Sequence, residues 1–178
     1  MLKLYDLEFV PLIPQAEIAA AVQKISDSIL KDFHDEIPIF VGILNGSFMF
    51  ISDLVKQYPG KCEVDFVKMK SYVGTESTGK IKEIIGLGNP NGKPLIIVED
   101  IIDTGNTIEN IVNTLEKTGV SNYKIASLFL KPEVYKKPYK IDYLGMEIPN
   151  KFIVGYGLDY NGLGRNLPEV FQLKNKIK

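Results

Sequence analysis

The stretch VEDIIDTGNT, residues 98–107, decides how this chain folds. It continues the apolar run PLIIV, residues 94–98, which is typical of a strand buried on both faces of a parallel sheet. It then passes through carboxylates and a Thr-Gly-Asn-Thr turn into residues 108–115, where apolar side chains recur with helical spacing. A buried strand followed directly by a helix indicates an α/β fold, in which ligands bind beyond the carboxyl ends of the strands.

The polar residues of this stretch suit a phosphorylated sugar. Thr104, Asn106 and Thr107 offer side-chain donors, and the backbone N–H groups of the turn and of the helix N-terminus can cradle a phosphate. Glu99 and Asp100 can bind sugar hydroxyls or a Mg²⁺ ion that accompanies a phosphorylated ligand. Together these residue types predict a phosphosugar site.

The same residues also have a purely structural interpretation. Asp and Asn commonly cap helices, and Glu109 lies three residues after Asn106, which is the spacing of a capping box. Against this, two acids placed directly after a buried strand carry a desolvation penalty that a simple turn would not need. The capping interpretation and the ligand-binding interpretation both stay open at this point.

Helical and strand patterns alternate along the rest of the chain. Helical apolar spacing is found in residues 15–33 and again from Phe48 onward. An acidic loop is predicted after residue 98, and residues 71–80 are predicted to form a mobile loop because they offer little to bury. Strands are predicted at residues 38–44, 63–69, 81–87, 94–98, 123–130, 141–144 and 152–156.

The length of 178 residues indicates a single domain over residues 1–178. Its core is expected at about residues 38–131 and a small hood at about residues 1–15 and 140–178. No internal repeat and no linker interrupts the chain.

Composition excludes several classes of protein. Lys plus Arg number 21 and Asp plus Glu 22, so the net charge of −1 lacks the positive field of sequence-independent nucleic-acid binding. A single cysteine, Cys62, and a single histidine, His34, exclude internal disulfides and His-rich zinc sites. No apolar run is long enough to cross a membrane, and the N-terminal segment is unlike a signal peptide. We therefore expect a cytoplasmic protein with no nucleic-acid or membrane partner.

Residues 98–107 resemble the phosphoribosyl-diphosphate (PRPP) binding motif of type I phosphoribosyltransferases, whereas P-loop and dinucleotide-binding motifs are missing from the sequence. The resemblance implies the fold of that family: a central, mostly parallel sheet flanked by helices, with a small hood formed by N- and C-terminal segments. Further stretches resemble, in family order, segments of the hypoxanthine-guanine phosphoribosyltransferases: GILNGS (42–47), KSY (70–72), STG (77–79), SLFLK (127–131) and KFIVGYGLDYN (151–161).

The resemblance implies a Mg²⁺-dependent reaction of purine salvage. PRPP and hypoxanthine, or guanine, would give IMP or GMP and pyrophosphate. Asp103 would act as general base or acid at purine N7, although without the family it is simply a helix cap. Glu99 and Asp100 would bind the ribose hydroxyls and one Mg²⁺. The cradle for PRPP and its 5′-phosphate would also comprise Asp103, Thr104, Gly105, Asn106 and Thr107.

By the same resemblance, the ammonium group of Lys131 donates to the exocyclic O6 of the purine and so selects a 6-oxopurine over adenine. Phe152 would stack on the base, and the backbone of Ile153 would meet its edge. Asp159 is assigned to the purine site and, through water, to a second Mg²⁺. Without the family, Lys131 is a solvated strand end, Phe152 a core aromatic and Asp159 a surface charge.

Pyrophosphate binding is implied for Asn45, Gly46 and Arg165, together with Ser71 and Tyr72 of the loop that would close over the site. The family often has lysine in place of Asn45, in a loop that often contains a cis peptide. Many members also have an arginine soon after the purine-selecting lysine, where this chain has the sequence PEVY. These two departures leave pyrophosphate mainly to Arg165, Mg²⁺ and backbone N–H groups.

Two other functions stay open. One is a xanthine-preferring purine phosphoribosyltransferase, because backbone groups read the purine 2-position and residue identities do not reveal them. The other is a PRPP-binding transcriptional regulator of the same fold. Two observations argue against a regulator: the residues implied for base binding are all present, and the net charge gives no positively charged surface for nucleic acid. The family further implies a homodimer or a homotetramer.

Overall fold

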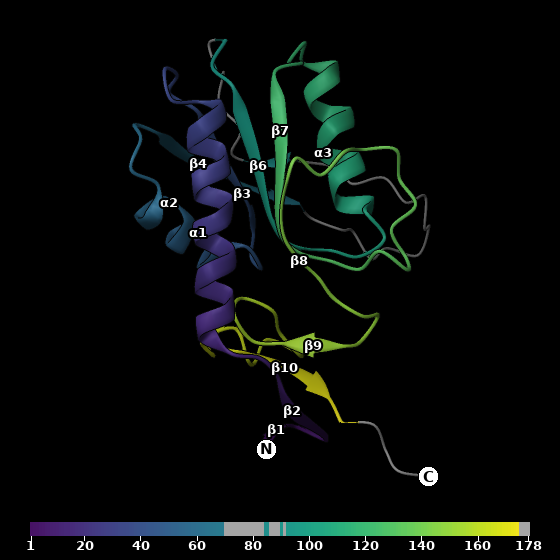
Figure 1. Ribbon diagram of the computed structural model, residues 1–178. Helices are drawn as coiled ribbons and strands as arrows, with labels where there is room; N and C mark the ends of the chain where they lie inside the picture. The colour runs from purple at the N-terminus through teal and green to yellow at the C-terminus, as the bar shows by residue number, and fades with distance from the viewer. Residues whose placement is uncertain (70–83, 86–89, 91, 175–178) are drawn as a thin grey trace, which may run out of the picture.

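The computed structural model describes residues 1–69, 84–85, 90 and 92–174 (Figure 1). Ser71, Tyr72 and the predicted mobile loop, residues 71–80, lie outside the described residues. Among the described helices, none has the length and apolar character needed to cross a membrane. In chain order the elements are β1 (Leu2–Leu4), β2 (Leu7–Ile13), α1 (Gln15–Asp32), β3 (Ile39–Leu44), α2 (Phe48–Gln57), β4 (Glu63–Met69), β5 (Ile84–Ile85), β6 (Leu95–Ile102), α3 (Asn106–Lys117), β7 (Tyr123–Leu130), β8 (Tyr143–Glu147), β9 (Ile153–Val154) and β10 (Val170–Leu173).

A six-stranded sheet in the order β5-β4-β3-β6-β7-β8 forms the centre of the molecule. All neighbouring pairs are parallel except β5, which runs antiparallel to β4. Helices α1 and α2 cover one face and α3 covers the other (Figure 1). Along β6, Ile96 and Val98 pack toward α1 and α2, whereas Leu95 and Ile97 pack toward α3. This burial on both faces explains the continuous apolar run and confirms the α/β fold class.

Strand β6 is longer than its apolar run predicts. Glu99 and Asp100, expected in a loop, lie inside the strand, because parallel pairing with β7 continues from Glu99 opposite Ser127 to Ile102 opposite Leu130. The backbone of both acids therefore belongs to the sheet, and their carboxyl groups are placed at its carboxyl edge by the strand and not by a turn.

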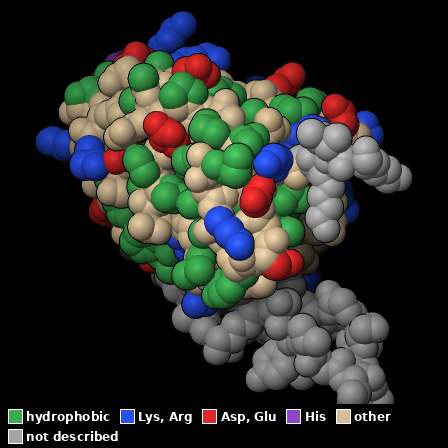
Figure 2. Space-filling model, turned by 90° about the horizontal axis from the view of Figure 1, so that it is seen from below, with side chains coloured by type: hydrophobic (Ala, Val, Ile, Leu, Met, Phe, Trp, Pro, Cys, Tyr) green, Lys and Arg blue, Asp and Glu red, His purple; other side chains and the backbone are tan. Residues whose placement is uncertain are grey.

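A second, four-stranded antiparallel sheet in the order β1-β2-β10-β9 joins the two ends of the chain. We call residues 2–13 and 153–173, which contain this sheet, the hood. The hood lies below the large sheet (Figure 1). Seen from below, the molecule carries hydrophobic side chains interspersed with both signs of charge, so neither sign dominates this face (Figure 2).

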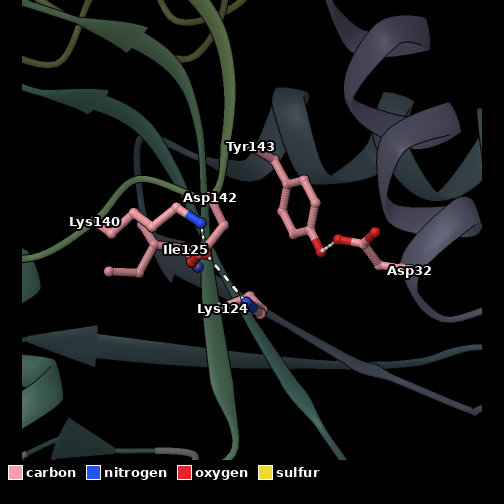
Figure 3. Close-up of polar contacts among 6 residues, drawn as sticks. All are labelled: Asp32, Lys124, Ile125, Lys140, Asp142 and Tyr143. Atoms are coloured by element: carbon pink, nitrogen blue, oxygen red, sulfur yellow. Dashed lines mark hydrogen bonds and ion pairs between the residues drawn. The ribbon is translucent and has the colours of Figure 1, made fainter.

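The expected hood segment beginning near residue 140 needs correction at its start. Residues 143–147 form β8, a parallel edge strand of the large sheet. Asp142 fixes this register, because its carboxylate accepts a hydrogen bond from the Ile125 N–H at 3.0 Å and pairs with Lys124 at 3.3 Å (Figure 3). The Tyr143 hydroxyl donates to Asp32 at 2.7 Å and ties β8 to α1 (Figure 3).

Candidate active site

Glu99 and Asp100 form a buried acidic pair at the end of β6. Their residues are only 7% and 4% exposed. Burial, helped by the neighbouring Asp100, raises the pKa of Glu99 well above its usual value, and burial raises the pKa of Asp100 to about 6. The Glu99 Oε2 atom has no hydrogen-bond partner among the described residues. Two desolvated carboxyls with a spare acceptor are unfavourable in the free protein and suit a ligand that brings positive charge or hydroxyl donors.

Asp100→Asn is expected to stabilise the protein free of metal and substrate. The pKa of Asp100 in the folded protein, about 6, lies above the ordinary value of 3.8. Folding therefore favours the protonated carboxyl: the protein has its full stability below pH 3.8, where Asp100 is protonated in both states, and loses stability as the pH rises through about 6. The raised pKa of Asp100 therefore lowers the free energy of unfolding by about 3 kcal/mol near pH 7.5, where the folded protein holds the carboxylate ionised. Near pH 5, where the carboxyl is mostly protonated in the folded protein, the cost is about half of that.

Thermal unfolding of both proteins with EDTA at these two pH values measures the effect. The Tm advantage of Asp100→Asn should be larger at about pH 7.5 than at about pH 5. A variant no more stable than the wild type at the higher pH would mean that contacts of the ionised carboxylate outweigh its burial.

The turn from β6 into α3 lacks the side-chain cap that many helices have at their N-terminus. Gly105 is the N-cap residue with φ of 81°, and no side chain caps the helix. Glu109 does not reach back to close a capping box, because its carboxylate pairs with Lys137 at 2.7 Å. The capping interpretation of Asn106 and Glu109 is therefore wrong. Among the described residues, no side chain accepts from the backbone N–H groups at the start of α3, as a phosphate cradle requires.

Lys131 and Asp103 meet between the ends of β7 and β6. The Lys131 Nζ donates to Asp103 Oδ2 at 2.9 Å, and the Lys131 N–H donates to the Ile102 carbonyl at 3.0 Å. The lysine side chain is 9% exposed and the aspartate side chain 47%. The interpretation of Lys131 as a solvated strand end is therefore wrong. A buried ammonium beside a half-exposed carboxylate offers one cationic donor and one proton acceptor to a ligand.

The loop after β3 packs directly on the acidic pair. The Leu44–Asn45 peptide is cis, which agrees with the feature expected from the family resemblance. A Cβ atom on Gly46 would lie 2.1 Å from Asp100 Oδ2, so only glycine fits against this carboxylate. Asn45 is exposed. The structure thus brings together the two groups predicted for Mg²⁺ and for pyrophosphate.

Arg165 and Asp159 extend the site from the hood. They form an ion pair, and Arg165 also donates to the Gly157 carbonyl at 2.7 Å. Gly157 has φ of 98°, and a Cβ atom there would lie 2.0 Å from the Gly46 carbonyl oxygen, so the hood touches the loop after β3. The charge of Arg165 lowers the pKa of Asp100 and that of Asp159 raises it, against the dominant effect of burial. Both side chains therefore act electrostatically on Asp100.

Ile153 begins β9 of the hood, and Phe152 directly precedes it. Ile153 is buried in the small sheet, whereas Phe152 is 46% exposed and is not the core aromatic that its apolar neighbours indicate. The Phe152 ring contacts Phe9 and Tyr160 at centroid distances of 6.2 and 5.9 Å. These contacts hold an exposed aromatic face without covering it, and such a face can stack on a planar ligand.

A divalent cation at this site would need substrate phosphates and water to complete its coordination. Within residues 1–69, 84–85, 90 and 92–174, no group of three or more His, Cys, Asp or Glu side chains is placed to bind a metal. Two carboxylates with a spare oxygen nevertheless fit Mg²⁺, because this ion keeps several waters and binds through one or two carboxylates plus substrate phosphates.

Sequence reasoning missed three residues that shape the site. Tyr135 and Lys137 lie over Gly105, where a Cβ atom would come within 2.5 Å of the tyrosine ring and 2.9 Å of the lysine stem. Gly157 makes the close contact between the hood and Gly46. The glycines were visible in the motifs, but their partners come from distant segments that no local pattern connects.

Comparisons with known proteins agree with this geometry. The family model described as phosphoribosyl transferase domain matches residues 13–161. The hypoxanthine-guanine phosphoribosyltransferase of Staphylococcus aureus is 38% identical over 168 residues, covering 93% of this chain and 94% of the relative.

Solved structures give the same result. A hypoxanthine-guanine phosphoribosyltransferase of Bacillus anthracis has a TM-score of 0.85 at 33% identity, covering 95% of this chain and 100% of the other. A hypoxanthine phosphoribosyltransferase of Staphylococcus aureus has a TM-score of 0.83 at 38% identity, covering 95% and 92%. The fold implied by the PRPP motif is thereby confirmed, and this chain belongs to the phosphoribosyltransferase family.

Proposed function

We propose that this protein transfers the 5-phosphoribosyl group of PRPP to N9 of hypoxanthine, and also of guanine, and releases pyrophosphate. The observation that carries the proposal is the contact of Lys131 with Asp103 beside the buried acidic pair, which joins a base-recognising group to a phosphosugar site. The names of the similar proteins, hypoxanthine-guanine phosphoribosyltransferase and hypoxanthine phosphoribosyltransferase, support it.

On the base side, Lys131 donates to purine O6, and Asp103 accepts or returns the proton at N7 as N9 bonds to the ribose carbon. The bond from that carbon to pyrophosphate breaks in the same step. The pairing with Lys131 keeps the Asp103 carboxylate oriented toward its donor before the base arrives. Phe152 stacks on the ring, the backbone of Ile153 meets its edge, and Asp159 lies beside it.

On the phosphosugar side, the N-terminus of α3 with Thr104, Gly105, Asn106 and Thr107 holds the 5′-phosphate. Glu99 and Asp100 bind the ribose hydroxyls and one Mg²⁺, and Asp159 binds a second through water. When bound, Mg²⁺ neutralises charge on the leaving pyrophosphate. The unpartnered Glu99 Oε2 supports this assignment.

Pyrophosphate is bound by Asn45, the Gly46 backbone and Arg165, whose guanidinium already lies in this corner of the site. Ser71 and Tyr72 join them from the loop beyond the described residues. We further propose a homodimer or homotetramer that works in the cytoplasm.

The test is an assay of purified protein with PRPP and Mg²⁺ against hypoxanthine, guanine, xanthine and adenine separately. Nucleotide and pyrophosphate should form from hypoxanthine and guanine, with little product from adenine, and EDTA should abolish both. Faster turnover of xanthine would favour a xanthine-preferring enzyme. PRPP binding without product from any base would contradict the proposal and favour a regulator.

A further inference from the structure

The segment between β7 and β8 covers the turn that begins α3. The Tyr135 ring and the Lys137 stem lie directly over Gly105, within the space that a Cβ atom there would need. The Tyr135 hydroxyl donates to the Tyr139 carbonyl at 2.6 Å, which fixes the ring in this place. The turn proposed to bind the 5′-phosphate is therefore backed by a segment that carries a lysine.

The ammonium group of Lys137 lies beside the first turn of α3. Lys137 Nζ pairs with Glu109 Oε2 at 2.7 Å, and the two side chains are 27% and 36% exposed. Glu109 is the acidic residue of this first turn. An acid there is attracted to the positive end of the helix dipole, which is the same potential that would attract a bound phosphate. Without compensation, Glu109 and the phosphate would repel each other.

We propose that Lys137 neutralises Glu109 and thereby keeps the N-terminus of α3 favourable for the ribose 5′-phosphate. Lys137 is then a positioning residue, which acts on substrate affinity through Glu109 and does not contact the reacting atoms. The proposal rests on the phosphoribosyl transfer proposed above and deepens the assignment of its phosphate site. It predicts that the two side chains matter as a pair.

The first variant is Lys137→Met, which keeps the stem over Gly105 and removes only the charge. We expect the KM for PRPP and the dissociation constant of ribose 5-phosphate to rise about three- to tenfold. The kcat and the KM for hypoxanthine should stay unchanged, because the base side of the site is not touched. The matched control is Lys136→Met, which changes an exposed neighbouring lysine and should leave all four quantities unchanged.

The second step is a double-mutant cycle with Glu109→Gln, which removes the repelling charge. Glu109→Gln alone should bind ribose 5-phosphate at least as well as the wild type, and Lys137→Met with Glu109→Gln should regain wild-type affinity. A double variant that stays as weak as Lys137→Met would overturn the proposal, because Lys137 would then act on the phosphate directly. Unchanged affinity in Lys137→Met would overturn it as well.

Calorimetry with ribose 5-phosphate separates this inference from the proposed function. This ligand carries the 5′-phosphate without pyrophosphate or base, so its binding needs no turnover. If the wild type converts no purine but the cycle behaves as described, the proposed reaction is wrong and the role of Lys137 stands. If the wild type converts purines but the double-mutant cycle shows no coupling between Lys137 and Glu109, the proposed reaction stands and the role of Lys137 is wrong.

Discussion

Asp103→Asn is expected to lower kcat by about 10²- to 10⁴-fold, which is the usual contribution of a positioned general acid or base. Asparagine has nearly the same shape but cannot take the proton from purine N7. In the wild type, Asp103 Oδ2 accepts a hydrogen bond from Lys131 Nζ at 2.9 Å, and the amide oxygen of asparagine can still accept this hydrogen bond. The KM for hypoxanthine should therefore change much less than kcat, and steady-state kinetics with each substrate varied in turn will separate the two.

The matched control for this variant is Asp142→Asn. Asp142 pairs with Lys124 at the start of β7 (Figure 3), and Asp103 pairs with Lys131 just after the end of the same strand. Each substitution therefore removes the charge of an aspartate that pairs with a lysine near one end of β7. Asp142→Asn should lower the Tm and leave kcat near the wild-type value. Turnover of Asp103→Asn within a few-fold of the wild type would remove Asp103 from the proton transfer.

Lys131→Met is expected to lower kcat/KM for hypoxanthine by about 10- to 100-fold, the range for losing a hydrogen bond from a charged donor. Lysine and methionine have similar apolar stems, so the packing of this 9% exposed side chain is largely kept. Adenine has an amino group at the same position and gains nothing from the ammonium. The ratio of hypoxanthine to adenine turnover should therefore fall by a similar factor in a competition assay.

Lys124→Met is the control for this second variant, since it removes a lysine from the opposite end of β7. It should leave the ratio of hypoxanthine to adenine turnover unchanged. If Lys131→Met keeps the wild-type ratio and affinity, recognition of O6 belongs to another group. A fall in kcat with unchanged base selectivity would instead indicate that Lys131 serves mainly to orient Asp103.

Local patterns predict the central elements because their apolar spacing is a property of short stretches. Residues 108–115 have the spacing of one helical face, and the structure buries their apolar side chains in α3. The same reasoning does not indicate β1, β2 or β10. β2 and β10 come from the two ends of the chain and pair with each other, with Leu173 opposite Phe9, and β1 adds to the outer edge of β2. The stability of these strands depends on that pairing and not on a local pattern.

The hypothesis of a phosphosugar site at residues 98–107 could be formed from the sequence because these residues are contiguous and their types suit such a ligand. Lys131, Phe152 and Arg165 were assigned only through the family resemblance, since each alone has an ordinary structural explanation. The structure decides between such explanations by burial, as when Lys131 is enclosed against Asp103.

The sequence by itself determined the α/β class, because strand burial and helix periodicity depend on neighbouring residues, and it predicted a phosphosugar site at the end of β6 from the types of its residues. Only the tertiary structure decided that Glu99 and Asp100 lie within the strand, that Gly157 meets Gly46, and that Lys137 pairs with Glu109. These features depend on contacts between residues far apart in the chain, and the energies of burial and charge pairing are set by such contacts.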